Sequence, residues 1–124
     1  MNLRDISEVL DAEALTPCSE ELMQREYTVA FASDLMSDAL AMIRHAHEDI
    51  FLLTGLCNPQ VLRTAEMLDV QTIVFVRGKR PSEDVIELAE EMGFNIFRTE
   101  YNMYTACGKL YEKGIHGLDE LDPA

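Results

Sequence analysis

Near the middle of the sequence stands Thr72-Ile73-Val74-Phe75-Val76, a run of strand-forming and mainly apolar residues. Similar runs occupy Ile50-Phe51-Leu52-Leu53 and Asn95-Ile96-Phe97-Arg98, so that Ile50, Ile73 and Ile96 are each 23 residues apart. That interval accommodates one short strand, one helix of about three turns and two loops. Continuous apolar strands are typical of parallel sheets, in which both faces of a strand are buried. The interval therefore predicts successive strand–helix units.

The segments between these runs carry helix start and stop signals. The first helix begins at Asn58-Pro59, where asparagine is a favoured cap and proline suits the first helical position. The second follows Pro81-Ser82, has acidic residues in its first turn and ends at Gly93. The third extends roughly over 102–113 and ends at Gly114. Helices thus alternate with strands throughout the second half.

The first half gives weaker signals of the same kind. Residues 27–32 alternate like a strand, and residues 35–43 then take helical spacing. A short amphipathic helix is expected over 3–10, and residues 12–15 are a candidate for one more strand. We therefore predict a three-layer α/β fold with a mainly parallel sheet of four to five strands and helices on both faces. We expect a single domain over residues 1–115 and an acidic C-terminal tail over 116–124.

Composition and charge narrow the classes of function. Hydrophobic residues make up 48% and charged residues 27% of the sequence, as in an ordinary globular protein. The 23 acidic and 10 basic side chains give a formal charge of −13, which opposes binding to nucleic acid or to anionic membranes. The sequence begins without a signal-peptide pattern and has no apolar run of membrane-spanning length. The expected location is therefore the cytoplasm.

Cysteine and histidine give little support for a metal or cofactor. Cys18, Cys57 and Cys107 have no Cys-x-x-Cys spacing, so we expect reduced thiols rather than disulfides or a zinc site. The segment His45-Ala46-His47-Glu48-Asp49 contains metal-ligand residue types, but it precedes a strand and belongs to the opposite edge of the sheet from the loops that follow the strands. The prediction is no metal and no cofactor.

Ligands of parallel sheets bind beyond the carboxyl ends of the strands. The loop at that edge after residue 76 carries Arg77, Lys79 and Arg80, and Arg98 ends the next strand, so basic residues gather on an acidic protein. Helix N-termini and the small residues Gly55 and Gly78 would add backbone N–H groups for a phosphate or carboxylate. The candidate ligand-binding residues are Ser33, Thr54, Gly55, Asn58, Arg77, Gly78, Lys79, Arg98 and Thr99.

Each of these features also has a simpler explanation. Lys79 and Arg80 are compatible with solvated loop charges, and Asn58 with a cap of its own helix. The phosphate-loop pattern and the Gly-x-Ser-x-Gly pattern of hydrolases are both absent from the sequence, which argues against a kinase and favours a non-catalytic role. Cys57 at a helix start is the one candidate nucleophile, since a helix dipole lowers a thiol pKa, but no general base accompanies it.

Three segments point to a known family: Ala32-Ser33-Asp34-Leu35-Met36-Ser37-Asp38-Ala39-Leu40, Leu53-Thr54-Gly55-Leu56-Cys57-Asn58-Pro59 and Phe94-Asn95-Ile96-Phe97-Arg98-Thr99. Through them, residues 33–114 resemble the DRTGG domain family. Such domains occur beside CBS domains, within phosphotransacetylases and in chains similar to the N-terminal domain of HPr kinase, and they are considered regulatory. Gly55-Leu56-Cys57 stands where the family has Gly-Asp-Arg, and Arg77-Gly78-Lys79 stands where it has Thr-Gly-Gly.

Together, the residues and the resemblance predict a non-catalytic regulatory module. Its ligand would be a small phosphate-containing or carboxylate anion, bound at the carboxyl edge, with a protein partner or a second copy of the chain as a further binding partner. Two alternatives remain open. One is a small enzyme that uses Cys57 or the basic loop 77–80. The other is a pure dimerisation domain, with Leu56, Tyr101 and Tyr104 at the interface.

Overall fold

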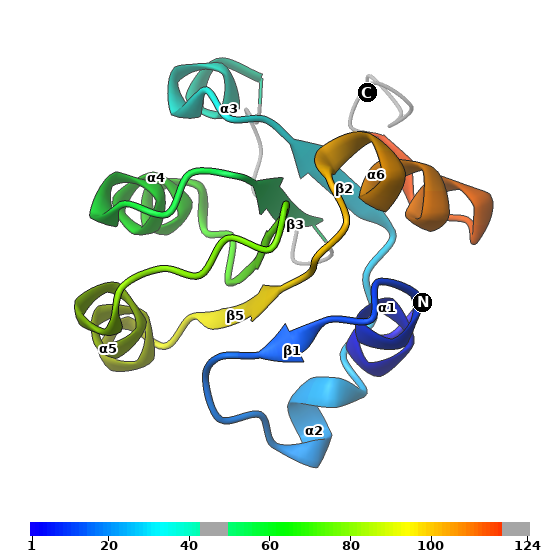
Figure 1. Ribbon diagram of the computed structural model, residues 1–124, viewed down its shortest axis with the longest axis horizontal. Coiled ribbons are helices and arrows are strands. Elements are labelled where there is room, and N and C mark those ends of the chain that lie inside the picture. The colour runs from blue at the N-terminus through cyan, green and yellow to red at the C-terminus, as the bar shows by residue number, and fades with distance from the viewer. Residues whose placement is uncertain (43–49, 118–124) are drawn as a thin grey trace.

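A computed structural model describes residues 1–42 and 50–117 of the chain, which form an α/β fold around one six-stranded sheet (Figure 1). The strand order is β1-β5-β4-β3-β2-β6. The strands are β1 (Glu13–Ala14), β2 (Val29–Ala32), β3 (Ile50–Thr54), β4 (Thr72–Phe75), β5 (Asn95–Arg98) and β6 (His116–Gly117). The helices are α1 (Leu3–Val9), α2 (Glu20–Met23), α3 (Met36–Met42), α4 (Pro59–Leu68), α5 (Glu83–Met92) and α6 (Met103–Glu112).

The sheet is parallel except at one edge. Strands β2, β3, β4 and β5 run parallel to one another, and β6 pairs in parallel with β2. Strand β1 pairs antiparallel with β5, with Glu13 opposite Arg98. The prediction of a mainly parallel sheet is confirmed, and the strand number is six rather than four to five. The additional pairing comes from His116 and Gly117, which the sequence analysis assigned to the tail; a two-residue strand is too short to leave a periodic pattern.

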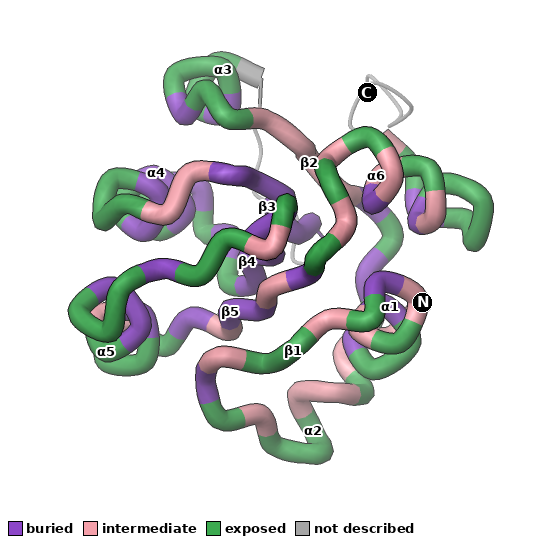
Figure 2. Tube along the Cα trace, in the orientation of Figure 1, coloured by how far each residue is buried: buried purple, intermediate pink, exposed green. Residues whose placement is uncertain are grey.

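Helices cover both faces of the sheet, which gives the three predicted layers (Figures 1 and 2). Apolar residues of α3, α4 and α5 pack on one face, and those of α1 and α6 pack on the other. Along β3, Ile50 and Leu52 point to the first core while Phe51 and Leu53 point to the second. Every residue of β3 and β4 is buried, as a central parallel strand requires.

The predicted helix signals act as expected. The Asn58 side chain accepts a hydrogen bond from the Val61 N–H at 3.3 Å, and Pro59 opens α4. Ser82 caps α5 in the same way, and Gly93 ends it in the left-handed conformation at φ 82°. None of the helices described in 1–42 and 50–117 has the length and apolar character needed to cross a membrane.

The strand register places four loops at one edge of the sheet. Thr54 lies opposite Phe75, and Phe75 lies opposite Arg98, so β3, β4 and β5 end side by side. Ala32, the last residue of β2, lies opposite Leu53. Residues 33–35, 55–58, 76–82 and 99–102 therefore leave the sheet together, and β1 enters it at the same edge because it runs in the opposite direction.

Candidate functional site

Three donors at the carboxyl edge converge on one carboxylate. The Gly55 N–H donates to Asp34 Oδ1 at 2.6 Å, and Thr54 Oγ1 lies 3.4 Å from the same oxygen. Arg77 Nη2 lies 3.6 Å from Asp34 Oδ2. We call Thr54 Oγ1, the Gly55 N–H and the Arg77 guanidinium the Arg77 cradle. The cradle is built from β3 and from the loop after β4, whereas the carboxylate that fills it comes from the loop after β2.

The cradle depends on a missing side chain at position 55. A Cβ atom added to Gly55 would lie 2.3 Å from Arg77 Nη2, so glycine leaves the space that the guanidinium occupies. The Thr54 hydroxyl also accepts from the Leu56 N–H at 3.1 Å, which orients its proton away from that amide. Two consecutive residues at the end of β3 thus present donors in fixed positions.

Arg77 has an unusual backbone conformation for a residue with a side chain. Its φ angle is +65°, in the left-handed region that favours glycine. The Arg77 N–H donates to the Tyr101 carbonyl at 2.7 Å, and the Gly78 N–H donates to the Thr99 carbonyl at 2.8 Å. The loop after β4 is therefore fixed to the loop after β5, and that attachment holds Arg77 over Gly55.

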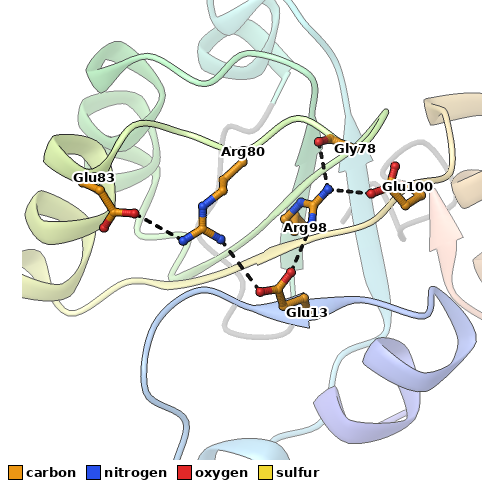
Figure 3. A network of polar contacts seen from close by, with 6 residues as sticks. All are labelled: Glu13, Gly78, Arg80, Glu83, Arg98 and Glu100. Carbon is orange, nitrogen blue, oxygen red and sulfur yellow. Dashed lines mark hydrogen bonds and ion pairs between the residues drawn. The ribbon is translucent and has the colours of Figure 1, made fainter.

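A second polar network lies at the β1 side of the same edge (Figure 3). Arg98 donates to Glu13 Oε2 at 3.1 Å, to the Gly78 carbonyl at 3.1 Å and to Glu100 Oε1 at 2.5 Å. Arg80 lies 3.8 Å from Glu13 Oε1 and 3.3 Å from Glu83 Oε1. We call these residues the Glu13 network. The network connects β1, the loop after β4 and the end of β5, so it helps to hold these three segments together.

Acidic side chains offset the positive charge that the sequence predicts at the carboxyl edge. The sequence places Arg77, Lys79, Arg80 and Arg98 together, and the structure adds an equal number of acids: Glu13, Asp34, Glu83 and Glu100. The edge is therefore balanced in formal charge rather than positive. In the described part of the chain, Lys79 makes no ion pair within 4.0 Å, whereas each of the three arginines does.

Several predicted site residues have their polar groups engaged in the fold. Thr99 is buried, and its hydroxyl donates to the Leu10 carbonyl at 2.6 Å. Ser33 accepts from the Leu35 N–H at 3.0 Å in a local turn. Asn58 caps α4. Gly78, at φ +66°, shapes the turn beside Glu100. Of the nine candidates, Thr54, Gly55 and Arg77 are the three whose polar groups contact the same carboxylate, that of Asp34.

Sequence reasoning missed Asp34 as a member of the site. Its signal was a carboxylate directly after a predicted strand, on the edge where ligands bind. The His45–Asp49 segment, considered for a metal, lies outside the described residues. Within 1–42 and 50–117, no group of three or more potential ligand side chains is arranged to hold a metal ion.

Cys57 lacks the activation that the enzyme alternative requires. Burial is the largest effect on the Cys57 thiol and raises its pKa. The charges of Lys79 and Arg77 lower that pKa and the charge of Asp34 raises it, and the net result is a raised pKa. The thiol is thus mainly protonated at neutral pH. For the dimer alternative, only one of the three predicted interface residues is largely exposed. That residue is Tyr104, whereas Leu56 and Tyr101 are half-buried against the two cores.

A cavity of about 400 Å³ lies between β2, α6 and β6; it reaches Ala32 at the carboxyl end of β2, but none of the cradle residues lines it. Its walls include Ala30, Ala32, Leu53, Leu110 and Ile115. An apolar lining of this kind does not suit a small anion. The cavity is therefore separate from the candidate site.

Comparison with known proteins gives one family and one fold. The family model described as DRTGG domain matches residues 5–112. The fold is similar to the crystal structure of the CBS and DRTGG domains of the regulatory region of Clostridium perfringens pyrophosphatase, complexed with the activator diadenosine tetraphosphate. The TM-score is 0.65 at 20% sequence identity, and the alignment covers 88% of this chain and 45% of that one. No curated protein matches the sequence.

Proposed function

This chain belongs to the DRTGG domain family, and on that premise we propose that it is a non-catalytic regulatory module that binds a small anion at the carboxyl edge of its sheet. The anion is a phosphate-containing molecule or a carboxylate. Its binding site is centred on the Arg77 cradle. The regulated partner is another protein or a second copy of the chain, and the expected location remains the cytoplasm.

The observation that carries the proposal is the carboxylate already held in the cradle. A backbone N–H, a hydroxyl and a guanidinium all point at Asp34, and together they form a set of donors that suits an oxyanion. Thr54 is paired in the sheet and Gly55 follows it directly, so two of these groups are carried by the end of a paired strand. The cradle is thus chemically selective for a negatively charged group.

The similar structure supports a regulatory role for this fold. There, CBS and DRTGG domains together form a regulatory region that is complexed with a polyanionic activator. At 20% identity the likeness concerns the fold, so our argument for the ligand class rests on the cradle.

A thermal-shift screen tests the proposal. Inorganic phosphate, acetyl phosphate, nucleotides and citrate are each added at about 10 mM, and a ligand present at about 100 times its Kd should stabilise the fold by roughly 2.7 kcal/mol. Arg77→Asn removes the guanidinium, and asparagine tolerates the left-handed backbone, so this variant should fold and lose the shift. Lys113→Asn is the matched control, because Lys113 lies beyond the far end of α6. If no anion stabilises the wild-type chain, or if Arg77→Asn responds like wild type, the proposal is wrong.

One observation favours a protein partner near the same edge. Tyr104, in the first turn of α6, is 89% exposed, and an aromatic side chain of this kind is typical of interaction surfaces. We propose that a partner chain contacts the module around Tyr104.

A further inference from the structure

We infer that Asp34 is an internal competitor: it occupies the anion position of the Arg77 cradle and has to leave before an external anion binds. The inference rests on the proposed function and specifies how that site is regulated. It concerns a residue outside the predicted ligand-binding set.

The first argument is that Asp34 uses the donors that a ligand needs. The Gly55 N–H has a single proton, and it is donated to Asp34 Oδ1 at 2.6 Å. Thr54 Oγ1 accepts a hydrogen bond from the Leu56 N–H and donates its own proton to the same carboxylate oxygen of Asp34. An external oxyanion cannot accept the Gly55 proton while Asp34 keeps it. Binding is therefore an exchange of one anion for another.

The backbone that carries the donors is held more firmly than the loop that carries the carboxylate. Gly55 is buried at the end of β3, and the Arg77 N–H is bonded to the Tyr101 carbonyl. The Asp34 side chain is 45% exposed and lies in the loop between β2 and α3, outside both elements. An exposed ion pair of this kind adds little to stability, so a ligand with stronger charge can displace it.

The Glu13 network gives the contrast. Arg98 is bonded to acceptors from three separate segments: Glu13, the Gly78 carbonyl and Glu100. Displacement of Glu13 would also disturb the pairing of β1 with β5, since Glu13 lies opposite Arg98 in the register. Glu13 and Asp34 thus have different roles at this edge: Glu13 fastens a strand, whereas Asp34 fills a binding position.

The exchange has a consequence for ligand choice. A monocarboxylate offers the cradle the same group that Asp34 already supplies at high local concentration. A phosphate group can carry two charges and offers three oxygens, so it competes better against the internal carboxylate. We therefore expect the wild-type chain to prefer phosphate-containing anions, and to gain affinity for simple carboxylates when Asp34 is removed.

The experiment titrates inorganic phosphate into wild type, Asp34→Ala and Asp34→Asn, and follows the amide signals by ¹⁵N–¹H NMR. Asp34→Ala should bind phosphate roughly tenfold more tightly, which corresponds to about 1.4 kcal/mol. The Gly55 amide signal should move when Asp34 is removed and move back toward its wild-type position as phosphate binds. Asp34→Asn keeps an acceptor without the charge and should fall between the two; it also serves as the test if the alanine variant does not fold.

Two controls separate competition from a general change in charge. Glu100→Gln removes one negative charge at the same edge without emptying the cradle, so it should leave phosphate affinity within about twofold of wild type. Asp34→Ala combined with Arg77→Asn should lose the gain.

The outcomes are distinct. If wild type binds phosphate and Asp34→Ala binds no better, the competitor role is wrong and the proposed function stands. If Glu100→Gln gains as much as Asp34→Ala, the competitor role is also wrong. If the Asp34 variants bind phosphate and wild type does not, Asp34 excludes the anion instead of exchanging with it, and both proposals are wrong for the wild-type chain. If none of the chains binds, both proposals are wrong.

Discussion

The backbone of Arg77 has the left-handed conformation, which glycine adopts more readily than a residue with a side chain. A left-handed conformation costs a residue with a Cβ roughly 1–2 kcal/mol, and its persistence requires compensation from the surroundings. Here the loop-to-loop hydrogen bonds from the Arg77 N–H to Tyr101 and from the Gly78 N–H to Thr99 supply it. Strained residues of this kind gather at functional sites, and this one lies at the centre of the candidate site.

At Cys57, the raised pKa predicts slow reaction with alkylating reagents. Because burial favours the protonated thiol, the thiolate fraction at pH 7.5 is lower than in an unfolded chain, and it rises only as the pH passes the raised pKa. Iodoacetamide labelling of the folded protein, followed by mass spectrometry, should give a Cys57 rate several-fold below that of the urea-unfolded chain. A folded rate above the unfolded one would restore the nucleophile alternative.

Some residues of the candidate site could be predicted from the sequence, and others could not. Thr54, Gly55 and Arg77 could be predicted, because each follows a recognisable strand and the edge rule places them together. Their partner could not be identified, since Asp34 meets Gly55 only through the pairing of β2 with β3. The same holds for Thr99: its hydroxyl is used by Leu10, a residue 89 positions away in the sequence.

Among the elements, the long strands and helices could be predicted, whereas of the shortest ones only β1 was expected, as the candidate strand over 12–15. Strands β3, β4 and β5 each contain consecutive apolar residues and are separated by capped helices, so local signals specify them. Strands β1 and β6 have two residues each, and α2 has four, so their conformation depends on tertiary contacts rather than on a period. Ser19, which caps α2, was a local signal available in the sequence.

The attachment of α1 to β5 yields a prediction at this scale. Thr99→Val removes the buried hydroxyl that donates to the Leu10 carbonyl and leaves that carbonyl without this donor, so the free energy of unfolding should fall by about 1–3 kcal/mol. Thr99→Ser keeps the hydroxyl and should lose less. Glu13→Gln alters the more conspicuous but exposed Glu13 network and should cost less than about 1 kcal/mol. Urea unfolding gives all three values; a larger loss for Glu13→Gln than for Thr99→Val would contradict this ranking.

Over the whole molecule, the charge of −13 predicts that salt stabilises the fold. Twenty-three acidic side chains face ten basic ones, so net repulsion opposes the compact state, and added salt screens it over distances beyond about 10 Å at 0.1 M. Raising potassium chloride from about 20 to about 300 mM should increase the Tm by a few degrees. The ion pairs at the carboxyl edge act in the opposite sense. A fall in Tm would mean that their loss outweighs the screening of repulsion.

The two-residue strands β1 and β6 form the outer edges of the sheet. A long, flat edge offers unpaired backbone groups to a strand from another chain, and such edges promote aggregation. Within residues 1–42 and 50–117, each outer strand presents the backbone of two residues, and β1 adds the exposed acid Glu13 to its edge. A partner chain therefore gains little from joining the sheet as a further strand. For a partner chain of the kind proposed, we therefore expect contacts with the helices and loops, whose side chains discriminate between partners in a way that backbone pairing does not.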